Sequence, residues 1–311
     1  MGGCFQRSSP VLFNIFLNDI FYFTENSSLF NYADDNCNSV CHKELNMVAT
    51  LLEREGTHMV EWFHSNGMKA NTSKFQWIIF SAGKPTTDIC VNLCGDDIPF
   101  VSEITVLGVC IDEKLTFNEH IKRVCTKASR QISALQRLSG VLDLDSRKVV
   151  YKCFILANFD FCPLVWLFTS RKSISLIRNV EERALRFVLR DSVSGYDTLV
   201  DKANMDAIRT STLKKMALEI YKILNGHSPE YLSSLFDKSD FTYKLRDGNR
   251  LVQPLTKTTR YGLKSLRYFG SHLWNIMPTN LKSESCFSTF KSMVTKWSGP
   301  TCNCSVCNLI I

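Results

Sequence analysis

The sequence predicts an α+β fold, in which a small antiparallel sheet with helices comes first and a mostly helical remainder follows. Short apolar segments separated by turn residues occupy residues 1–112, as in antiparallel hairpins. From about Asn118 onward, apolar residues recur at helical spacing instead. The charge changes at the same place, because residues 1–112 carry 6 Lys and Arg against 13 Asp and Glu, whereas the remainder carries 31 against 17. We therefore expect two regions with different structures and opposite net charges.

The composition is that of a chain large enough for two or three domains. It has 311 residues, of which 45% are apolar, and this suffices for buried cores. No run of about 20 apolar residues is present. The most apolar stretch, residues 149–168, is interrupted by charged residues and by Pro163, so we expect buried helices there and no membrane span. Since no signal peptide is evident, we expect the 13 cysteines to be reduced thiols in the nucleus or cytoplasm of a protein that is not secreted.

Apolar spacing predicts the elements of the first region in order. A helix is expected from about Pro10 to Asp19, and a hairpin follows with strands near 28–33 and 36–41. A long helix is predicted over Lys43 to Ser65, and Gly67 is a suitable helix stop.

Short strands are expected after this helix, near residues 76–81, 88–93, 97–101 and 104–110. Gly95, Asp96 and Asp97 are interpreted as a hairpin turn, because Gly and Asp favour turns. This second acid pair is therefore given no function.

The adjacent acids Asp34 and Asp35 directly follow the apolar run that ends in Tyr32 and Ala33. At a tight turn, two carboxylates can be presented together at one edge of a hairpin. Two hard oxygen ligands of this kind suit Mg²⁺ when water and phosphate supply the rest of its coordination. A site with two metals can then stabilise both oxygens of an in-line phosphoryl displacement. The alternative is that the pair is only turn chemistry, since Asp is favoured in turns.

The predicted helix that begins near Asn118 has one apolar stripe and a strongly basic remainder. The stripe runs from Ile121 to Leu138, and the basic residues are Lys122, Arg123, Lys127, Arg130 and Arg137. Further helices are expected at 145–157, 171–190 and 205–225, the last of them ending at Gly226. Such basic helices can contact a nucleic-acid backbone. The alternative is a helical bundle whose Lys and Arg residues are merely solvated.

The last part of the chain begins with residues 236–264, which are polar and show little periodicity, so a linker or loosely ordered loop is expected. Aromatic residues return between Leu266 and Trp297. They can stack on bases, but at helical spacing we interpret them as core.

Three thiols close the sequence, at Cys302, Cys304 and Cys307. Their spacing suits zinc, but a closed structural zinc site needs four ligands. Cys286 or His272 can complete such a site only if the chain folds back. The alternative is a free tail without metal.

Five segments in this order resemble the reverse transcriptases of non-LTR, LINE-like retrotransposons. Residues 3–20 are similar to that family's Pro-Gln-Gly-Ser loop and the helix after it, and Tyr32 to Asp35 match its acidic box. Asn71 and Lys74 match the Leu-Asn-x-x-Lys motif, and Leu107 and Gly108 match the primer-grip hairpin. Residues 266–275 resemble the C-terminal segment of such elements.

The resemblance implies an RNA-directed DNA polymerase that acts by two-metal nucleotidyl transfer on an RNA template and a DNA primer, with dNTP as substrate. Mg²⁺ or Mn²⁺ would be bound by Asp34 and Asp35, and Asp34 would be the more direct ligand. By the same resemblance, Tyr32 would pack at the primer–nucleotide face, and Gln6 would contact the template or the nucleotide. Lys74 would neutralise charge on the incoming triphosphate. Leu107 and Gly108 would support the end of the primer.

The same resemblance divides the chain into a partial polymerase palm over residues 1–112, a helical thumb over 113–235, and a linker with a basic C-terminal region and cysteine tail over 236–311. The family's third metal-binding Asp is expected to precede Met1, and Asp19 is not expected to replace it. Phe5 and Arg7 also depart from the pattern, which has Pro and Gly at these positions. We therefore expect this chain alone to be inactive.

Two alternatives to a polymerase fragment follow from these departures. The chain can be a catalytically inactive remnant that still binds nucleic acid, or a fragment that does not fold by itself. No membrane association is expected, and protein partners are not indicated.

Overall fold

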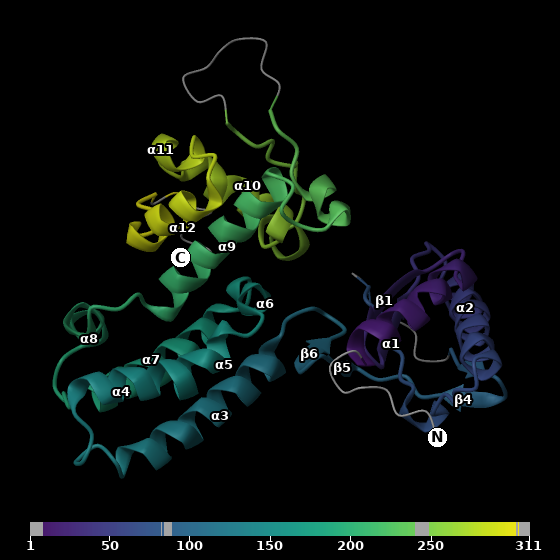
Figure 1. The fold of residues 1–311 in the computed structure, drawn as a ribbon, viewed down its shortest axis with the longest axis horizontal. Coiled ribbons are helices and arrows are strands. Elements are labelled where there is room, and N and C mark those ends of the chain that lie inside the picture. Colours follow the sequence, from purple (N-terminus) through teal and green to yellow (C-terminus); the bar gives the residue numbers. More distant parts are fainter. Residues whose placement is uncertain (1–8, 82, 84–88, 240–248, 303, 305–311) are drawn as a thin grey trace. The chain divides into compact units, whose positions relative to one another are not determined.

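The computed structural model describes residues 9–81, 83, 89–239, 249–302 and 304. It divides into two compact units, Met1–Thr116 and Phe117–Ile311, called the first and second unit below (Figure 1). The fold is mixed α+β and mostly helical, with 57% helix and small antiparallel two-stranded sheets, so the predicted fold class is confirmed. None of the described helices is both long enough and apolar enough to span a membrane. The three-part division made from the sequence stays a prediction.

The first unit combines three β-hairpins with one long helix and short helical turns. Its elements are α1 Ser9–Leu17, η1 Asn18–Phe23, β1 Ser28–Tyr32, β2 Asp35–Ser39, α2 Leu45–Ser65, η2 Thr72–Lys74, β3 Val91–Leu93, β4 Asp96–Ile98, β5 Glu103–Val106 and β6 Val109–Asp112. Within the described residues, β1 and β2, β3 and β4, and β5 and β6 form separate antiparallel pairs. The predicted antiparallel architecture is therefore present, as three hairpins that are not joined into one sheet.

Helix α2 organises the first unit. Met59 and Trp62 pack against Leu17 and Ile20 of the preceding helical segment, and Ala49 lies in a second cluster with residues of β3 and β4. The helix ends where the sequence predicts it, because Gly67 adopts a left-handed φ of 73° that is easy only for glycine.

Strand boundaries after α2 differ from the prediction. The expected strand at 76–81 is reduced, in its described part, to a single bridge between Trp77 and Phe100. The turn expected at residues 95–97 lies at Cys94 and Gly95, with φ of 56° and 93°, so Asp96 and Asp97 belong to β4. Two-residue hairpins favour turns with positive φ.

The strand expected at 104–110 is a hairpin, since β5 and β6 are joined by a turn at Leu107 and Gly108 with φ of 48° and 82°. Because β-branched residues lie on both sides of Leu107 and Gly108, the sequence pattern predicted one continuous strand and not a turn. Its position agrees with the hairpin that the family resemblance implies at these two residues.

The second unit is helical. Its elements are α3 Asn118–Gln136, α4 Leu144–Val150, η3 Tyr151–Leu156, α5 Ala157–Asp160, α6 Pro163–Leu167, α7 Arg171–Leu189, α8 Tyr196–Ala203, α9 Ile208–Leu224, η4 Glu230–Leu235, η5 Thr259–Leu263, α10 Leu266–Ile276, α11 Thr279–Lys282 and α12 Phe287–Lys296. The helices predicted at 171–190 and 205–225 correspond to α7 and α9, and the helix at 145–157 corresponds to α4, η3 and the start of α5. Gly226 ends α9 with a φ of 71°, and the His227 N–H donates to the carbonyl of Lys222.

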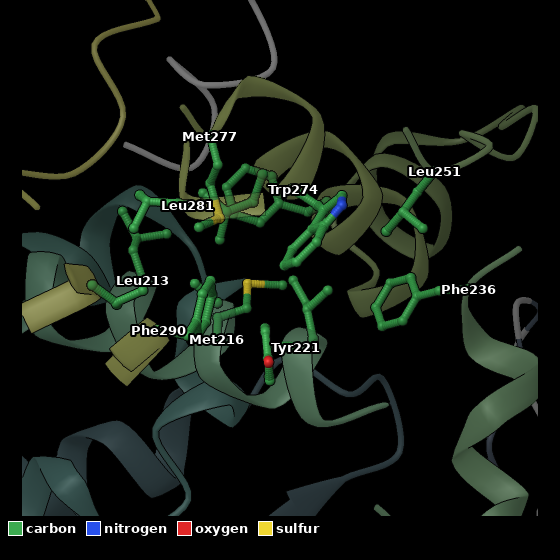
Figure 2. Packing of buried hydrophobic residues seen from close by; sticks show 14 of the residues in the cluster. Leu213, Met216, Tyr221, Phe236, Leu251, Trp274, Met277, Leu281 and Phe290 are labelled. Carbon is green, nitrogen blue, oxygen red and sulfur yellow. The ribbon is translucent and has the colours of Figure 1, made fainter. Parts of the chain in front are cut away.

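Two hydrophobic clusters support these helices. One lies among α3, η3 and α7 and includes Ile121, Ala128 and Ile155. The other surrounds α9, where residues of α10 to α12 pack against it (Figure 2). Tyr221 stacks on Phe290 with ring centroids 4.2 Å apart.

The segment predicted as a linker contains two buried residues, one in each of its described parts. Phe236 and Leu251 are buried in the α9 cluster (Figure 2), and the Leu251 N–H donates to the Asn275 side chain at 2.8 Å. Phe269, Trp274 and Phe290 are also buried there, which confirms that these aromatics are core. The linker over residues 236–264 stays a prediction, and the average polarity of this segment hid two apolar residues that are buried in its described part.

Candidate functional site

Asp34 and Asp35 lie at the tip of the hairpin formed by β1 and β2, which we call the acid hairpin (residues 28–39). Tyr32 pairs directly with Asp35, so Ala33 and Asp34 form the two-residue turn. Ala33 has a left-handed φ of 52°, a conformation that is disfavoured for a residue with a Cβ. Both carboxylates are exposed. The local fold therefore places both acids at the exposed tip of the acid hairpin.

The two faces of the acid hairpin differ in chemistry. Phe30 and Tyr32 lie on one face with Asp35 and are 57% and 68% exposed. Beside them, burial and the nearby Asp35 charge raise the pKa of Cys37. An aromatic and acidic surface of this kind can receive a base or sugar next to a bound metal.

The opposite face carries Leu29, Asn31, Asn36 and Asn38, which pair across the two strands. The side-chain amides of Asn31 and Asn38 are buried and have no hydrogen-bond partner among the described residues. Asn36 donates to the Asp34 carbonyl at 3.2 Å. This amide-lined face was not predicted from the sequence. Asn31, Asn36 and Asn38 occupy alternate positions of the two strands, and this pattern could have indicated it.

Glu55 of α2 fixes the segment that leads into the acid hairpin. Its side chain is completely buried and accepts hydrogen bonds from the N–H groups of Glu25 at 2.9 Å and Asn26 at 3.2 Å. Arg54 donates to it at 3.0 Å. Burial raises the pKa of Glu55, but the hydrogen bonds from Arg54 and from the two backbone groups outweigh it, so the net pKa is lowered. The sequence could have indicated this buried acid, because Glu55 lies four residues before Met59 on the apolar face of the helix.

The acid hairpin suits a magnesium ion only in part. Asp34 and Asp35 offer the hard oxygen ligands that Mg²⁺ prefers. In the part of the chain that the structure describes, no third Asp or Glu gathers with them, since the one group of three ligand-type side chains found there is His272, Cys302 and Cys304.

The other predicted site residues occupy separate elements of the first unit. Lys74 is exposed at the end of η2, and Leu107 is 44% exposed at the β5–β6 turn. The structure thus brings Tyr32, Asp34 and Asp35 together, whereas Lys74, Leu107 and Gly108 stand on their own elements. Gln6 and Cys307 lie outside the described residues.

A basic groove runs along α3 in the second unit. It has a volume of about 540 Å³, and its lining includes Lys122, Arg130 and Arg137 together with Leu176 of α7. A neighbouring hollow of about 470 Å³ adds Arg123 and Lys127. All five basic residues are exposed, while Ile121, Ala128 and Ile132 face the core. The predicted division of this helix into apolar and basic faces is therefore confirmed.

A second positive cluster, which no sequence motif indicated, lies where α9 begins. The Nε and Nη2 atoms of Arg209 are buried without a hydrogen-bond partner among the described residues, and burial lowers the pKa of Arg209 to about 10. Burial and the charges of Arg171, Arg209 and Arg260 lower the pKa of Lys264. These four cations come from three separate helices and the residue after η5, so only tertiary packing assembles them.

Two of the three C-terminal thiols, Cys302 and Cys304, lie close to His272 of α10 in the second unit. The ligand atoms of His272, Cys302 and Cys304 all lie within 4.8 Å of one another, and Cys304 Sγ is 3.4 Å from His272 Nε2. The chain therefore does fold back, and of the two candidates to complete the group it is His272 that approaches. Cys286 instead contacts the Ser288 hydroxyl.

Comparison with known proteins gives one distant similarity. The chain is 22% identical over 237 residues to a protein described as a probable RNA-directed DNA polymerase from transposon X-element of Drosophila melanogaster. The aligned part covers 75% of this chain and 24% of that polymerase, so the chain spans about a quarter of its relative's length. No protein-family model matches, and no solved structure matches. The similarity is at family level and agrees with the resemblance seen in the motifs.

Proposed function

We propose that this chain is the part of an RNA-directed DNA polymerase that carries two metal-binding carboxylates and a helical duplex-binding region. The observation that carries the proposal is the acid hairpin, which presents Asp34 and Asp35 beside Tyr32 in a chain with distant similarity to a retrotransposon polymerase. Magnesium or manganese ions at these carboxylates supply charge stabilisation for an in-line phosphoryl displacement.

The proposed roles of the surrounding residues follow the motifs. Asp34 is the more direct metal ligand and Asp35 the second. Tyr32 packs against the primer end or the nucleotide, and Lys74 neutralises phosphate charge. Leu107 and Gly108 support the primer from their own hairpin, and Gln6 contacts template or nucleotide.

By itself, the chain is expected not to extend a primer, because the described residues bring only two carboxylates to the site. Primer extension on a homopolymer RNA template with Mg²⁺ or Mn²⁺ measures this. Primer extension by the wild-type chain would contradict the expected inactivity. If the Asp34→Asn variant then loses this activity, the two carboxylates of this chain suffice for catalysis.

A chimera tests the catalytic role directly. In the X-element polymerase, the aligned region is replaced by this chain, so that the rest of the polymerase comes from the relative. The chimera should extend a primer, and Asp34→Asn should abolish extension. Asp96→Asn is the matched control, since Asp96 is an exposed acid in the β3–β4 hairpin and should leave extension unchanged. A folded chimera whose extension survives Asp34→Asn would refute the proposal.

Nucleic-acid binding without catalysis is the second candidate function, and the basic groove on α3 favours it. Lys122 and Arg137 are fifteen residues apart, which corresponds to about 22 Å along a helix, long enough to contact several phosphates. Each phosphate contact adds about 0.9 to the slope of log affinity against log salt.

Binding of an RNA–DNA duplex by the full chain, followed by fluorescence anisotropy at several salt concentrations, tests this groove. Changing Lys122, Arg130 and Arg137 together to Ala should weaken binding and lower the salt slope by about 2–3. The control changes three exposed lysines of the same unit outside the groove, Lys152, Lys291 and Lys296. An equal loss in both triple variants would mean that net charge alone drives binding.

A further inference from the structure

The strongest unassigned feature is the group that joins α10 to the end of the chain. His272 lies in the middle of α10, and Cys302 and Cys304 follow α12. All three side chains are half-buried. Their ligand atoms converge within 4.8 Å, and no other group of three potential ligands does so among the residues that the structure describes.

The spacing of these atoms suits zinc. Zinc binds thiolate sulfur at about 2.3 Å and imidazole nitrogen at about 2.0–2.1 Å in a tetrahedron. Such bond lengths separate a ligating sulfur and nitrogen by about 3.5 Å and two sulfurs by about 3.8 Å. The observed separation of Cys304 Sγ and His272 Nε2 is 3.4 Å, and all three ligand atoms lie within 4.8 Å of one another. An ion can therefore enter if the wider separations close by up to about 1 Å.

The imidazole already has the orientation that a metal ligand needs. Its Nδ1 atom lies 3.0 Å from the Gln253 side-chain amide, which leaves Nε2 directed at Cys304. The amide of Gln can be turned so that its oxygen accepts the Nδ1–H. Metal-bound histidines usually donate their second ring N–H to an acceptor of this kind, which fixes the tautomer.

Zinc binding sets the protonation states of these three ligands. A ligating histidine is neutral. Two thiolates balance the charge of one Zn²⁺ ion, because each thiol releases its proton to solvent on binding.

We propose that His272, Cys302 and Cys304 bind a zinc ion that fastens the C-terminal segment to α10. The closed loop between His272 and Cys302 contains α11 and α12, so the ion holds α12 in place over the α9 cluster. The site uses these three ligands and leaves the fourth tetrahedral position to water or a further donor. It is independent of the acid hairpin and of any polymerase activity.

Metal analysis of the full chain, purified with reductant and loaded with Zn²⁺ before dialysis, tests the site. About one zinc per chain should remain bound, as a three-ligand protein site predicts. Cobalt substitution should give the absorption of thiolate-to-metal charge transfer together with the d–d bands of tetrahedral coordination. His272→Ala and the double change of Cys302 and Cys304 to Ser should each abolish both signals.

Controls separate this site from adventitious binding. Cys286→Ser and His227→Ala change an exposed thiol and another imidazole of the same unit, and both should retain full zinc. Gln253→Leu should weaken zinc binding by about tenfold, the usual effect of removing an orienting partner. The proposal is refuted if the wild-type chain retains no more zinc than the double cysteine variant, or if His272→Ala retains the wild-type amount.

Discussion

At the scale of single residues, the side chain of Glu55 links the long helix of the first unit to the segment before the acid hairpin. It is fully buried, and its partners lie about thirty residues earlier, at the backbone of Glu25 and Asn26. Such an acceptor is costly to remove, because the part-buried N–H groups of Glu25 and Asn26 lose their hydrogen-bond partner.

Replacing Glu55 by Ala should therefore lower the unfolding free energy of the first unit by about 1–3 kcal/mol. Hydrogen exchange of residues 24–39 should also accelerate, since the hairpin loses its anchor. Glu61→Ala, at an exposed position of the same helix, is the control and should have little effect. Equal effects of both changes would show that helix propensity or charge is responsible.

The pH dependence of this contribution has a definite sign. The folded-state pKa of Glu55 is lowered by its hydrogen bonds to Arg54, Glu25 and Asn26, which outweigh the opposing effect of burial. Its stabilisation is therefore complete above the unfolded value of about 4.3 and is lost as the pH falls through the lower folded value. The stability difference between wild type and Glu55→Gln should shrink over this acidic range in urea titrations. A difference that grows on acidification would show that the pKa is raised.

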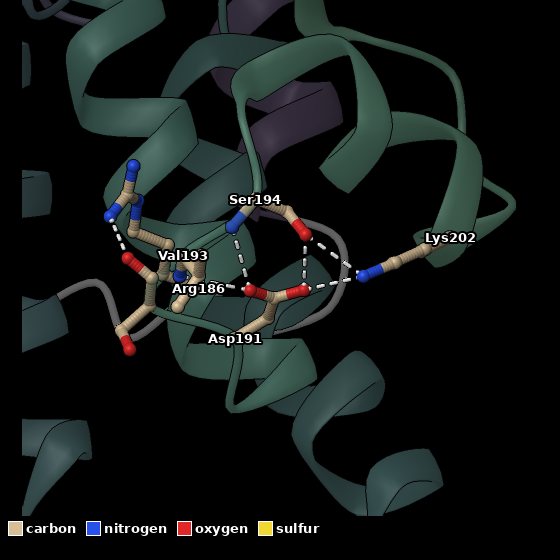
Figure 3. Close-up of polar contacts among 6 residues, drawn as sticks. Arg186, Asp191, Val193, Ser194 and Lys202 are labelled. Carbon is tan, nitrogen blue, oxygen red and sulfur yellow. Dashed lines mark hydrogen bonds and ion pairs between the residues drawn. The ribbon is translucent and has the colours of Figure 1, made fainter.

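At the scale of elements, the loop between α7 and α8 is stabilised by one carboxylate. Asp191 accepts from the N–H groups of Val193 and Ser194 at 3.0 and 2.9 Å, from the Ser194 hydroxyl at 2.7 Å, and from Lys202 Nζ at 2.7 Å (Figure 3). Lys202 first, and then these other donors, hold the pKa of Asp191 well below its usual range. The Asp191 carboxylate thus accepts hydrogen bonds from the loop directly after the end of α7.

Removing this acceptor should loosen the connection between the two helices. We expect Asp191→Ala to lower the melting temperature of the second unit, and Lys202→Ala to lower it less, because three of the four donors still reach the carboxylate. Asp201→Ala, at an exposed position of α8, serves as the control. Differential scanning calorimetry measures the order of the three melting temperatures. A larger effect of Lys202→Ala than of Asp191→Ala would contradict the expectation that the three donors from Val193 and Ser194 hold the loop without Lys202.

At the scale of the whole molecule, the two units have cores of very different size. Among the described residues, the two clusters of the first unit contain four buried residues each, whereas the two main clusters of the second unit contain fifteen and thirteen. The first unit also exposes apolar side chains on α1 and η1, among them Val11, Ile15 and Tyr22, which are 61%, 66% and 82% exposed. Less buried apolar area means less stability, so the first unit should be the weaker one.

The full chain should consequently unfold in two transitions, with the first unit melting at the lower temperature. Glu55→Ala should shift only the lower transition. Met216→Ala, which removes a completely buried side chain of the second unit, should shift only the upper one, by the equivalent of about 2–5 kcal/mol. A single transition that both changes shift would show that the units unfold together. Failure of the lower transition to appear would favour the interpretation that this region does not fold by itself.

The sequence determined the local features of this protein, because their causes lie within a few neighbouring residues. Helical periodicity predicted α2, α3, α7 and α9, and Gly67 and Gly226 marked two of their ends. The order of apolar and turn residues also placed Asp34 and Asp35 at a hairpin tip. Short strands were less certain, since the β3–β4 and β5–β6 turns depend on single positive-φ residues such as Cys94 and Leu107.

Only the tertiary structure decided which distant side chains meet. Glu55 with the backbone of Glu25, Arg209 with Lys264, and His272 with Cys302 and Cys304 are pairs whose members are roughly thirty or more residues apart. Such contacts depend on how helices pack and where the chain returns, and local propensity contains no information on either. The acid pair was visible in the sequence for the opposite reason, because both carboxylates and the turn that presents them lie within four consecutive residues.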